Sequence, residues 1–130
     1  MGYRATVRRA QKIYKKIGVI PCPALNDLVH FTRIGFDHVI GGKRKKRSKR
    51  EQKRRFRLLE YAEQIVKNPK ALIQYREQEV KYVENRHGKK TLITATGKFW
   101  TFIETVKNTR LKVVVGQIGQ KAKQFISIMQ

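Results

Sequence analysis

The spacing of apolar residues changes once along the chain, and this change limits what the chain can fold into. Before Asn68-Pro69, apolar residues recur at the spacing of amphipathic helices, and after it they occur in runs of strand-forming residues. Helices followed by strands in a chain of 130 residues predict a single α+β domain. In this domain the N-terminal helices cover one face of an antiparallel sheet that the C-terminal half forms.

Two helices are predicted, over residues 3–17 and 49–67. The first has an apolar stripe at helical spacing, formed by Tyr3, Val7, Ala10, Tyr14 and Ile17. Gly18 is a natural end for this helix. The second begins with Ser48 and Glu51 in a capping-box pattern and ends at Asn68-Pro69. Its first turns therefore form a rigid array of Lys and Arg side chains.

The segment between the helices and the second half of the chain predict less regular boundaries. Pro21 and Pro23 predict an extended loop, followed by a short strand or turn. The predicted elements of the second half are strands 71–78 and 80–85 joined by a tight turn, a loop over 85–90, a short strand 91–97, a hairpin of 98–106 and 110–118, and a last strand within 121–129. Alternation places Phe125 and Ser127 on one face of the last strand.

The net charge of the chain limits the classes of molecule that it is expected to bind. The chain has 31 Lys and Arg residues against 9 Asp and Glu, a formal charge of +22, and ten of the basic residues lie between positions 43 and 55. Such a field attracts polyanions, so nucleic acid is the leading partner and an anionic membrane surface the second. The basic face of helix 3–17 could equally be a solvated surface.

Several kinds of site are disfavoured. Cys22 is the only cysteine, which excludes an intramolecular disulfide and a four-thiolate zinc site and suits a reducing compartment. His30, His38 and His87 lack metal-ligand spacing, and the sequence contains no phosphate-binding glycine loop. We therefore expect no cofactor and no metal. No apolar run has the length of a membrane span.

A distributed pattern over residues 30–130 suggests a family. FDHVIGGKRKKRSKREQKRRFRLLEYAEQIVKNP is followed by YREQ, FWTFIE and RLKVVVGQIGQKAKQFISIM. This order resembles the barnase, EndoU, colicin and RelE-like nuclease superfamily, in particular its phage-encoded and polymorphic-toxin domains; residues 1–29 lie outside the resemblance. The resemblance implies a curved antiparallel sheet and a metal-independent endoribonuclease, a toxin or effector that cleaves tRNA or other cellular RNA. It also implies a monomer that acts in the cytoplasm, and an acidic immunity protein or antitoxin as partner.

The resemblance also implies site residues. His38 would be a general base or acid, Arg47 would bind the scissile phosphate, and Arg76 would do likewise or form a cross-strand ion pair. Lys123 and Ser127 would contribute from the last strand. RNA would be bound by a basic set: Lys43, Arg44, Lys45, Lys46, Lys49, Arg50, Lys53, Arg54 and Lys121.

One position departs from the family pattern. Gln124 stands where a histidine is expected between the basic residue and the aromatic residue of the last strand, and an amide cannot exchange protons at neutral pH. In one interpretation, His38 exchanges protons together with Lys123 or with a tyrosine, and His87 is a fallback acid. In the other, the chain binds RNA without cleaving it. The alternative function is therefore a non-catalytic RNA- or DNA-binding module.

Overall fold

The structure is a computed structural model that describes residues 3–32 and 49–130. It has two long helices, α1 (Tyr3–Ile17) and α3 (Lys49–Lys67), and a short 3-10 turn η1 (Pro23–Leu25). The strands are β1 (Val19–Cys22), β2 (Asp27–His30), β3 (Leu72–Arg86), β4 (Lys89–Val106), β5 (Thr109–Ile118) and β6 (Gln124–Met129). The α+β class is confirmed, and both helices have the predicted bounds.

All six strands belong to one sheet, in the order β1-β2-β6-β5-β4-β3. The ladders are antiparallel except that between β2 and β6, which is parallel. The prediction of an antiparallel sheet formed by the C-terminal half is thus wrong in two respects: one ladder is parallel, and two strands come from the N-terminal part of the chain. The predicted loop at Pro21 is strand β1, which pairs with β2. Because β2 also pairs with β6, it joins this hairpin to the C-terminal strands. Pro21 is tolerated because β1 is an edge strand.

The strands of the C-terminal half are longer than the sequence predicted. Residues 71–78 and 80–85 do not pair with each other, because both belong to β3, which runs beside β4 along its whole length. The predicted loop 85–90 shrinks to the turn His87-Gly88, where both residues have positive φ. The hairpin of β4 and β5 is confirmed, with Lys107 and Asn108 at its turn.

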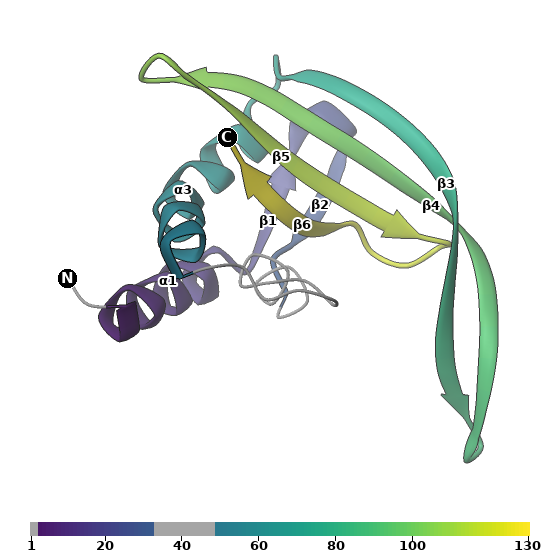
Figure 1. The fold of residues 1–130 in the computed structure, drawn as a ribbon. Helices are drawn as coiled ribbons and strands as arrows, with labels where there is room; N and C mark the ends of the chain where they lie inside the picture. The colour runs from purple at the N-terminus through teal and green to yellow at the C-terminus, as the bar shows by residue number, and fades with distance from the viewer. Residues whose placement is uncertain (1–2, 33–48) are drawn as a thin grey trace.

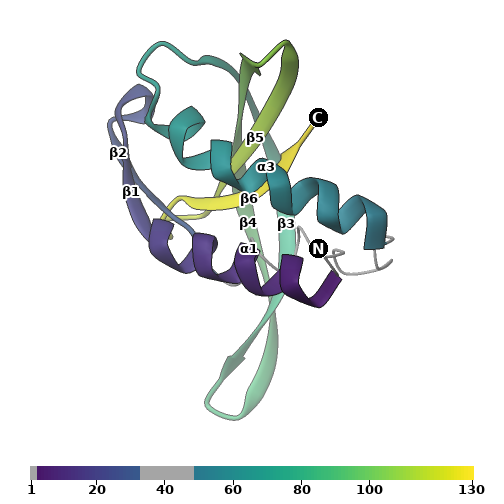
Figure 2. The same ribbon diagram turned by 90° about the vertical axis from the view of Figure 1, so that its left-hand side faces the viewer.

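Both helices lie on the same side of the sheet (Figures 1 and 2). In α1 the residues Ala10, Tyr14 and Ile17 are buried, as the apolar stripe predicts. They join buried side chains of α3 and of the sheet in one hydrophobic cluster. Burial of this apolar surface is what holds the basic helices against the sheet.

Three aromatic rings connect α1 to the centre of the sheet. Phe31, which follows β2, stacks on Phe125 of β6 with ring centroids 4.6 Å apart and an interplanar angle of 6°. Tyr14 of α1 packs against Phe31 at 5.7 Å and against Phe125 at 5.9 Å. The Tyr14 hydroxyl also donates a hydrogen bond to the Thr32 carbonyl oxygen. This ring cluster joins β2 to β6, which share a single registered pair of residues.

Candidate nucleic-acid interface

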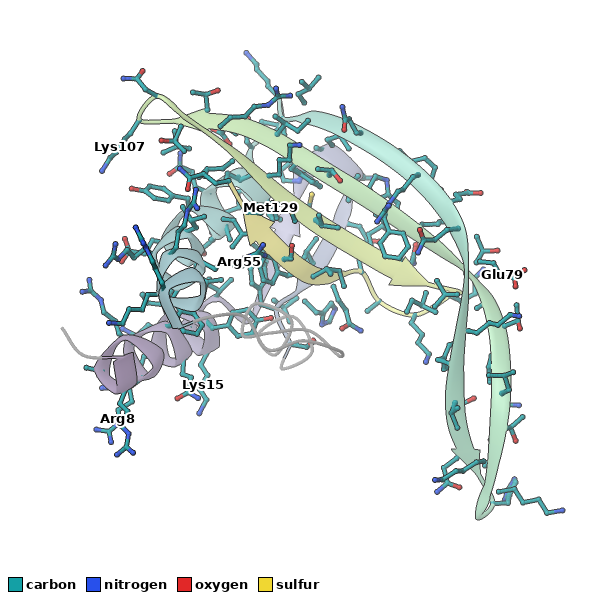
Figure 3. All side chains as sticks on the ribbon, in the orientation of Figure 1. Arg8, Lys15, Arg55, Glu79, Lys107 and Met129 are labelled. Atoms are coloured by element: carbon teal, nitrogen blue, oxygen red, sulfur yellow. The ribbon has the colours of Figure 1, made fainter. Side chains whose placement is uncertain are left out.

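The two helices present a dense cationic surface. In α1 there is no acidic residue, and six basic side chains are exposed: Arg4, Arg8, Arg9, Lys12, Lys15 and Lys16. Arg8 and Lys15 point away from the rest of the molecule in Figure 3. In α3, Arg50, Arg54 and Arg57 are exposed and Lys53 is half-buried. Arg9 forms an exposed ion pair with Glu60 of α3 at 3.6 Å, and such a pair adds little stability.

Part of the predicted site falls on residues that the structure does not describe. His38 and Arg47, and with them Lys43, Arg44, Lys45 and Lys46, are outside the described residues, as are Ser48 and the side chain of Lys49. The described members Arg50, Lys53 and Arg54 lie on α3 as predicted.

The basic helix also contacts the last strand. Arg54 Nε donates to Gln130 Oε1 at 2.5 Å, and Arg55 Nη1 donates to the Ile128 carbonyl oxygen at 3.4 Å. A cavity of about 60 Å³ between α3 and the end of β6 is lined by Arg54, Arg55, Leu58, Met129 and Gln130. Figure 3 shows Arg55 and Met129 on these two elements. Two guanidinium groups of the helix therefore contact the C-terminal end of the chain, at Ile128 and Gln130.

A row of residues crosses the sheet on the face opposite Phe125 and its buried neighbours. The ladders register Arg76 with Phe99, Phe99 with Gly116, Gly116 with Gln124, and Gln124 with His30. Registered partners point to the same side of a sheet, so these five residues share one face. We call them the outer row.

Two contacts order the ends of the outer row. The Arg76 guanidinium lies over the Phe99 ring, 5.2 Å from its centroid, rather than in the cross-strand ion pair that the sequence left open. At the other end, the Thr32 hydroxyl donates to Gln124 Oε1 at 3.0 Å and fixes the orientation of this amide. Four strand spacings, about 19 Å, separate Arg76 from His30, so the two cannot contact the same phosphate group.

His30 is the residue that the sequence interpretation missed. It was considered only as a metal ligand, yet its position on β2 is the registered partner of Gln124 on β6. The backbone N–H of His30 donates to the Lys123 carbonyl oxygen at 2.9 Å. An imidazole thus lies beside the position where the last strand lacks one. No local signal marks it, because the pairing joins segments about 90 residues apart.

Lys123 belongs to a different group of residues. Its side chain is only 14% exposed, and its Nζ forms an ion pair with Asp27 Oδ2 at 2.6 Å. This hydrogen bond lowers the pKa of the Asp27 carboxyl below its ordinary value of 3.8. Lys123 Nζ also lies 5.3 Å from the centroid of the Trp100 ring, on the side of β4 that carries the buried Phe102.

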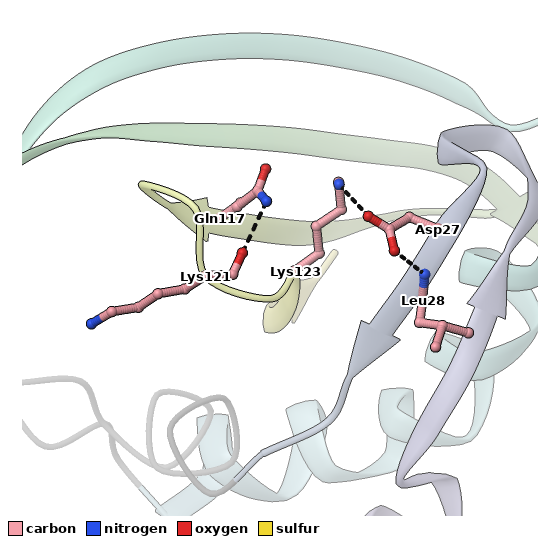
Figure 4. A network of polar contacts seen from close by, with 5 residues as sticks. All are labelled: Asp27, Leu28, Gln117, Lys121 and Lys123. Carbon is pink, nitrogen blue, oxygen red and sulfur yellow. Dashed lines mark hydrogen bonds and ion pairs between the residues drawn. The ribbon is translucent and has the colours of Figure 1, made fainter.

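The two neighbouring lysines point in different directions. In Figure 4, the amino group of Lys123 meets Asp27, whereas the Lys121 side chain extends the opposite way. Lys121 is exposed, and its Nζ lies 4.5 Å from the centroid of the Tyr82 ring on β3. Lys121 therefore lies at the surface against β3, and Lys123 is engaged in an ion pair within the protein.

Ser127 does not lie on the face that the sequence predicted. A β-bulge in β6 pairs Val115 with Phe125 but Val114 with Ser127, so one extra residue of β6 separates the two rungs. Ser127 and Phe125 therefore face opposite sides of the sheet. Ser127 is only 2% exposed, and in this conformation it cannot reach a substrate in solvent.

A tyrosine beside Trp100 does not supply the missing proton acceptor. Tyr75 packs against Trp100 with ring centroids 5.4 Å apart, and its hydroxyl donates to Glu77 Oε1 at 2.5 Å. This hydrogen bond raises the pKa of Tyr75 to about 12. Its hydroxyl therefore stays protonated at neutral pH.

Comparison with known proteins does not place the chain in a family. No protein-family model, curated protein or solved structure matches it. Within residues 3–32 and 49–130, no three His, Cys, Asp or Glu residues cluster as a metal site would require, and no helix is long and apolar enough to cross a membrane.

Proposed function

We propose that this protein is a metal-independent endoribonuclease of the small α+β type that the sequence resembles. The observation that carries the proposal is the registration of His30 with Gln124, which supplies an imidazole to the outer row of a basic sheet protein. The position of the basic helix α3 directly before the strands β3 to β6 supports it. So do the cationic helices, which would contact phosphates on either side of the cleavage site.

The proposed reaction needs two proton-transfer groups. One takes the proton of a ribose 2′-hydroxyl, whose oxygen attacks phosphorus, and the other gives a proton to the departing 5′-oxygen. The products are an end with a 2′,3′-cyclic phosphate and an end with a 5′-hydroxyl. In this proposal His30 is one of the two groups and His38 the other, and Gln124 donates a hydrogen bond to the phosphate. Arg76 would contact a different nucleotide of the same strand.

The remaining expectations belong to the same proposal. A cytoplasmic ribonuclease of this kind would act as a toxin or effector, and its producer would need an acidic protein to neutralise it. The basic surface of α1 and α3 suits such a partner in charge.

The deciding experiment incubates purified protein with total RNA and tRNA in a metal chelator and identifies the new ends. We expect 2′,3′-cyclic phosphate ends, and a rate that falls about 10²- to 10⁴-fold in the His30→Ala variant. The matched control is Leu28→Ala, which changes an exposed residue of the same strand. Intact RNA with the wild-type protein, or equal rates for wild type and His30→Ala, would overturn the proposal.

The second candidate function is non-catalytic RNA binding. It is favoured by the separation of the predicted catalytic residues, because Lys123 is paired with Asp27 and Ser127 is buried. In that case wild type and His30→Ala both shift an RNA band in a gel and leave the RNA whole. His38→Ala, compared in the same assay, tests the other histidine.

A further inference from the structure

Strands β3 and β4 continue beyond the rest of the sheet as a two-stranded arm. The β4–β5 ladder begins at Gly97, whereas β3 and β4 pair for eight further rungs, from Glu79–Thr96 to Arg86–Lys89. We call residues 79–96 the arm. It projects away from the helices and the other strands in both ribbon views (Figures 1 and 2). Eight rungs at about 3.3 Å each give it a reach of about 26 Å.

The base of the arm is held by specific contacts. An added Cβ at Gly97 would lie 2.5 Å from Val80 Cγ2 and 2.8 Å from Phe99 Cε2, so these side chains close over the glycine. On the same face, Lys121 from the β5–β6 turn lies over the Tyr82 ring. A two-stranded ribbon alone is marginal in water, and these contacts fix its direction relative to the sheet.

The arm carries cations that its own carboxylates do not neutralise. Glu79 pairs with Lys81 at 3.8 Å and Glu84 pairs with Arg86 at 2.9 Å. The two acidic residues of the arm are therefore both engaged. Lys89 and Lys90, beside the turn, are exposed and form no ion pair within the described part of the chain.

One face of the arm also exposes an apolar pair. Val83 and Leu92 are registered partners, 62% and 64% exposed. The next rungs on this face are Lys81–Thr94 and Asn85–Lys90, so a cation stands on each side of the pair. Single-stranded RNA is bound mainly by stacking on aromatic rings, and these three rungs offer none. Double-stranded RNA is instead recognised by its shape and by contacts to 2′-hydroxyls and phosphates across a wide, shallow minor groove, and these contacts need no aromatic ring.

We propose that the arm binds the sugar–phosphate backbone of a base-paired segment of RNA. Lys90, on the same face as Val83 and Leu92, contacts one phosphate, and Lys89, next to the turn at the tip of the arm, contacts another. Val83 and Leu92 lie against riboses of the shallow minor groove. The inference rests on the proposed action on RNA and adds the class of substrate: an RNA with a base-paired stem at the arm and a single strand at the outer row. Val83 and Leu92 lie on the face of β3 and β4 opposite the outer row, so such an RNA passes around the edge of the sheet at β3.

The test measures binding to an RNA hairpin with a single-stranded extension, in which only the loop and the extension are made of 2′-O-methyl nucleotides, so that they cannot be cleaved and the stem keeps its 2′-hydroxyls. The variants are Lys89→Ala with Lys90→Ala, and Leu92→Ala. The control, Lys70→Ala with Arg110→Ala, removes the same charge from two exposed residues at the other end of the sheet. Losing two phosphate contacts should lower the slope of log K against log salt by about 1.8 and weaken binding about 10- to 30-fold at 0.15 M salt. Leu92→Ala should weaken binding without changing the slope.

The outcomes separate the two proposals. If the wild-type protein binds neither the hairpin nor a single-stranded oligonucleotide, the proposed function itself fails. If it binds the hairpin and the Lys89/Lys90 variant loses no more affinity than the control, only the role of the arm is wrong. Sedimentation decides against RNA as the occupant if Leu92→Ala converts a dimer into a monomer, because the apolar pair would then bind a second copy of the chain.

Discussion

Removal of the Phe125 ring should destabilise the protein strongly. Phe125 is fully buried between Phe31 and Tyr14, with the ring distances given above. Truncation of a buried phenylalanine to alanine costs about 3–5 kcal/mol of unfolding free energy. With an unfolding entropy of about 2.1 cal/mol/K per residue, this corresponds to a fall in Tm of about 11–18 °C for this chain.

Calorimetry or circular dichroism melting of Phe125→Ala measures this shift. The control is Tyr75→Ala, which removes an aromatic ring that is 50% exposed, and there we expect a loss below about 1 kcal/mol, or about 4 °C. A double-mutant cycle with Phe31→Ala should give a coupling of about 0.5–1.5 kcal/mol for the stacked pair.

The same substitution has a local readout. Because β2 and β6 share one registered pair, the ring cluster supplies much of their attachment. Phe125→Ala should therefore speed amide hydrogen exchange at His30, whose N–H donates to the Lys123 carbonyl oxygen, more than at strand residues remote from the substitution. A Tm shift no larger than that of Tyr75→Ala, or unchanged exchange at His30, would refute the idea that the rings hold the two strands together.

Two further predictions concern an ion pair and a turn. Lys123→Met should raise the pKa of Asp27 toward 3.8, as carboxyl chemical shifts followed through a pH titration would show. Because the folded pKa of Asp27 is lowered, its contribution to stability is present above pH 3.8 and is lost as pH falls through the folded pKa; equal acid unfolding of wild type and variant would contradict this. At the β4–β5 turn, Lys107→Asn with Asn108→Gly should stabilise the protein by about 0.5–1 kcal/mol in thermal melts, because both positions have positive φ; a lower Tm would show that the native pair makes contacts that outweigh this gain.

Local patterns in the sequence determined the helices and their ends. The stripe through Ala10, Tyr14 and Ile17 and the positive φ at Gly18 agree with the predicted helix 3–17, and Asn68-Pro69 ends α3 as predicted. These features depend on neighbours within one or two turns, which a sequence displays directly. The positive charge of both helices was likewise evident from the sequence.

The strands, and with them the candidate site, depended on distant partners. The sequence pattern divides both β3 and β4 at apparent turn residues. In the structure the backbone groups of the two strands pair in one continuous ladder, so neither strand is interrupted there. An extra residue in β6 places Ser127 and Phe125 on opposite faces of the sheet, and no pattern in the sequence of this strand predicts such a bulge. The parallel pairing that brings His30 beside Gln124 joins segments far apart in the chain. The sequence by itself determined that the protein is a basic α+β domain, and only tertiary pairing decided which side chains share a face.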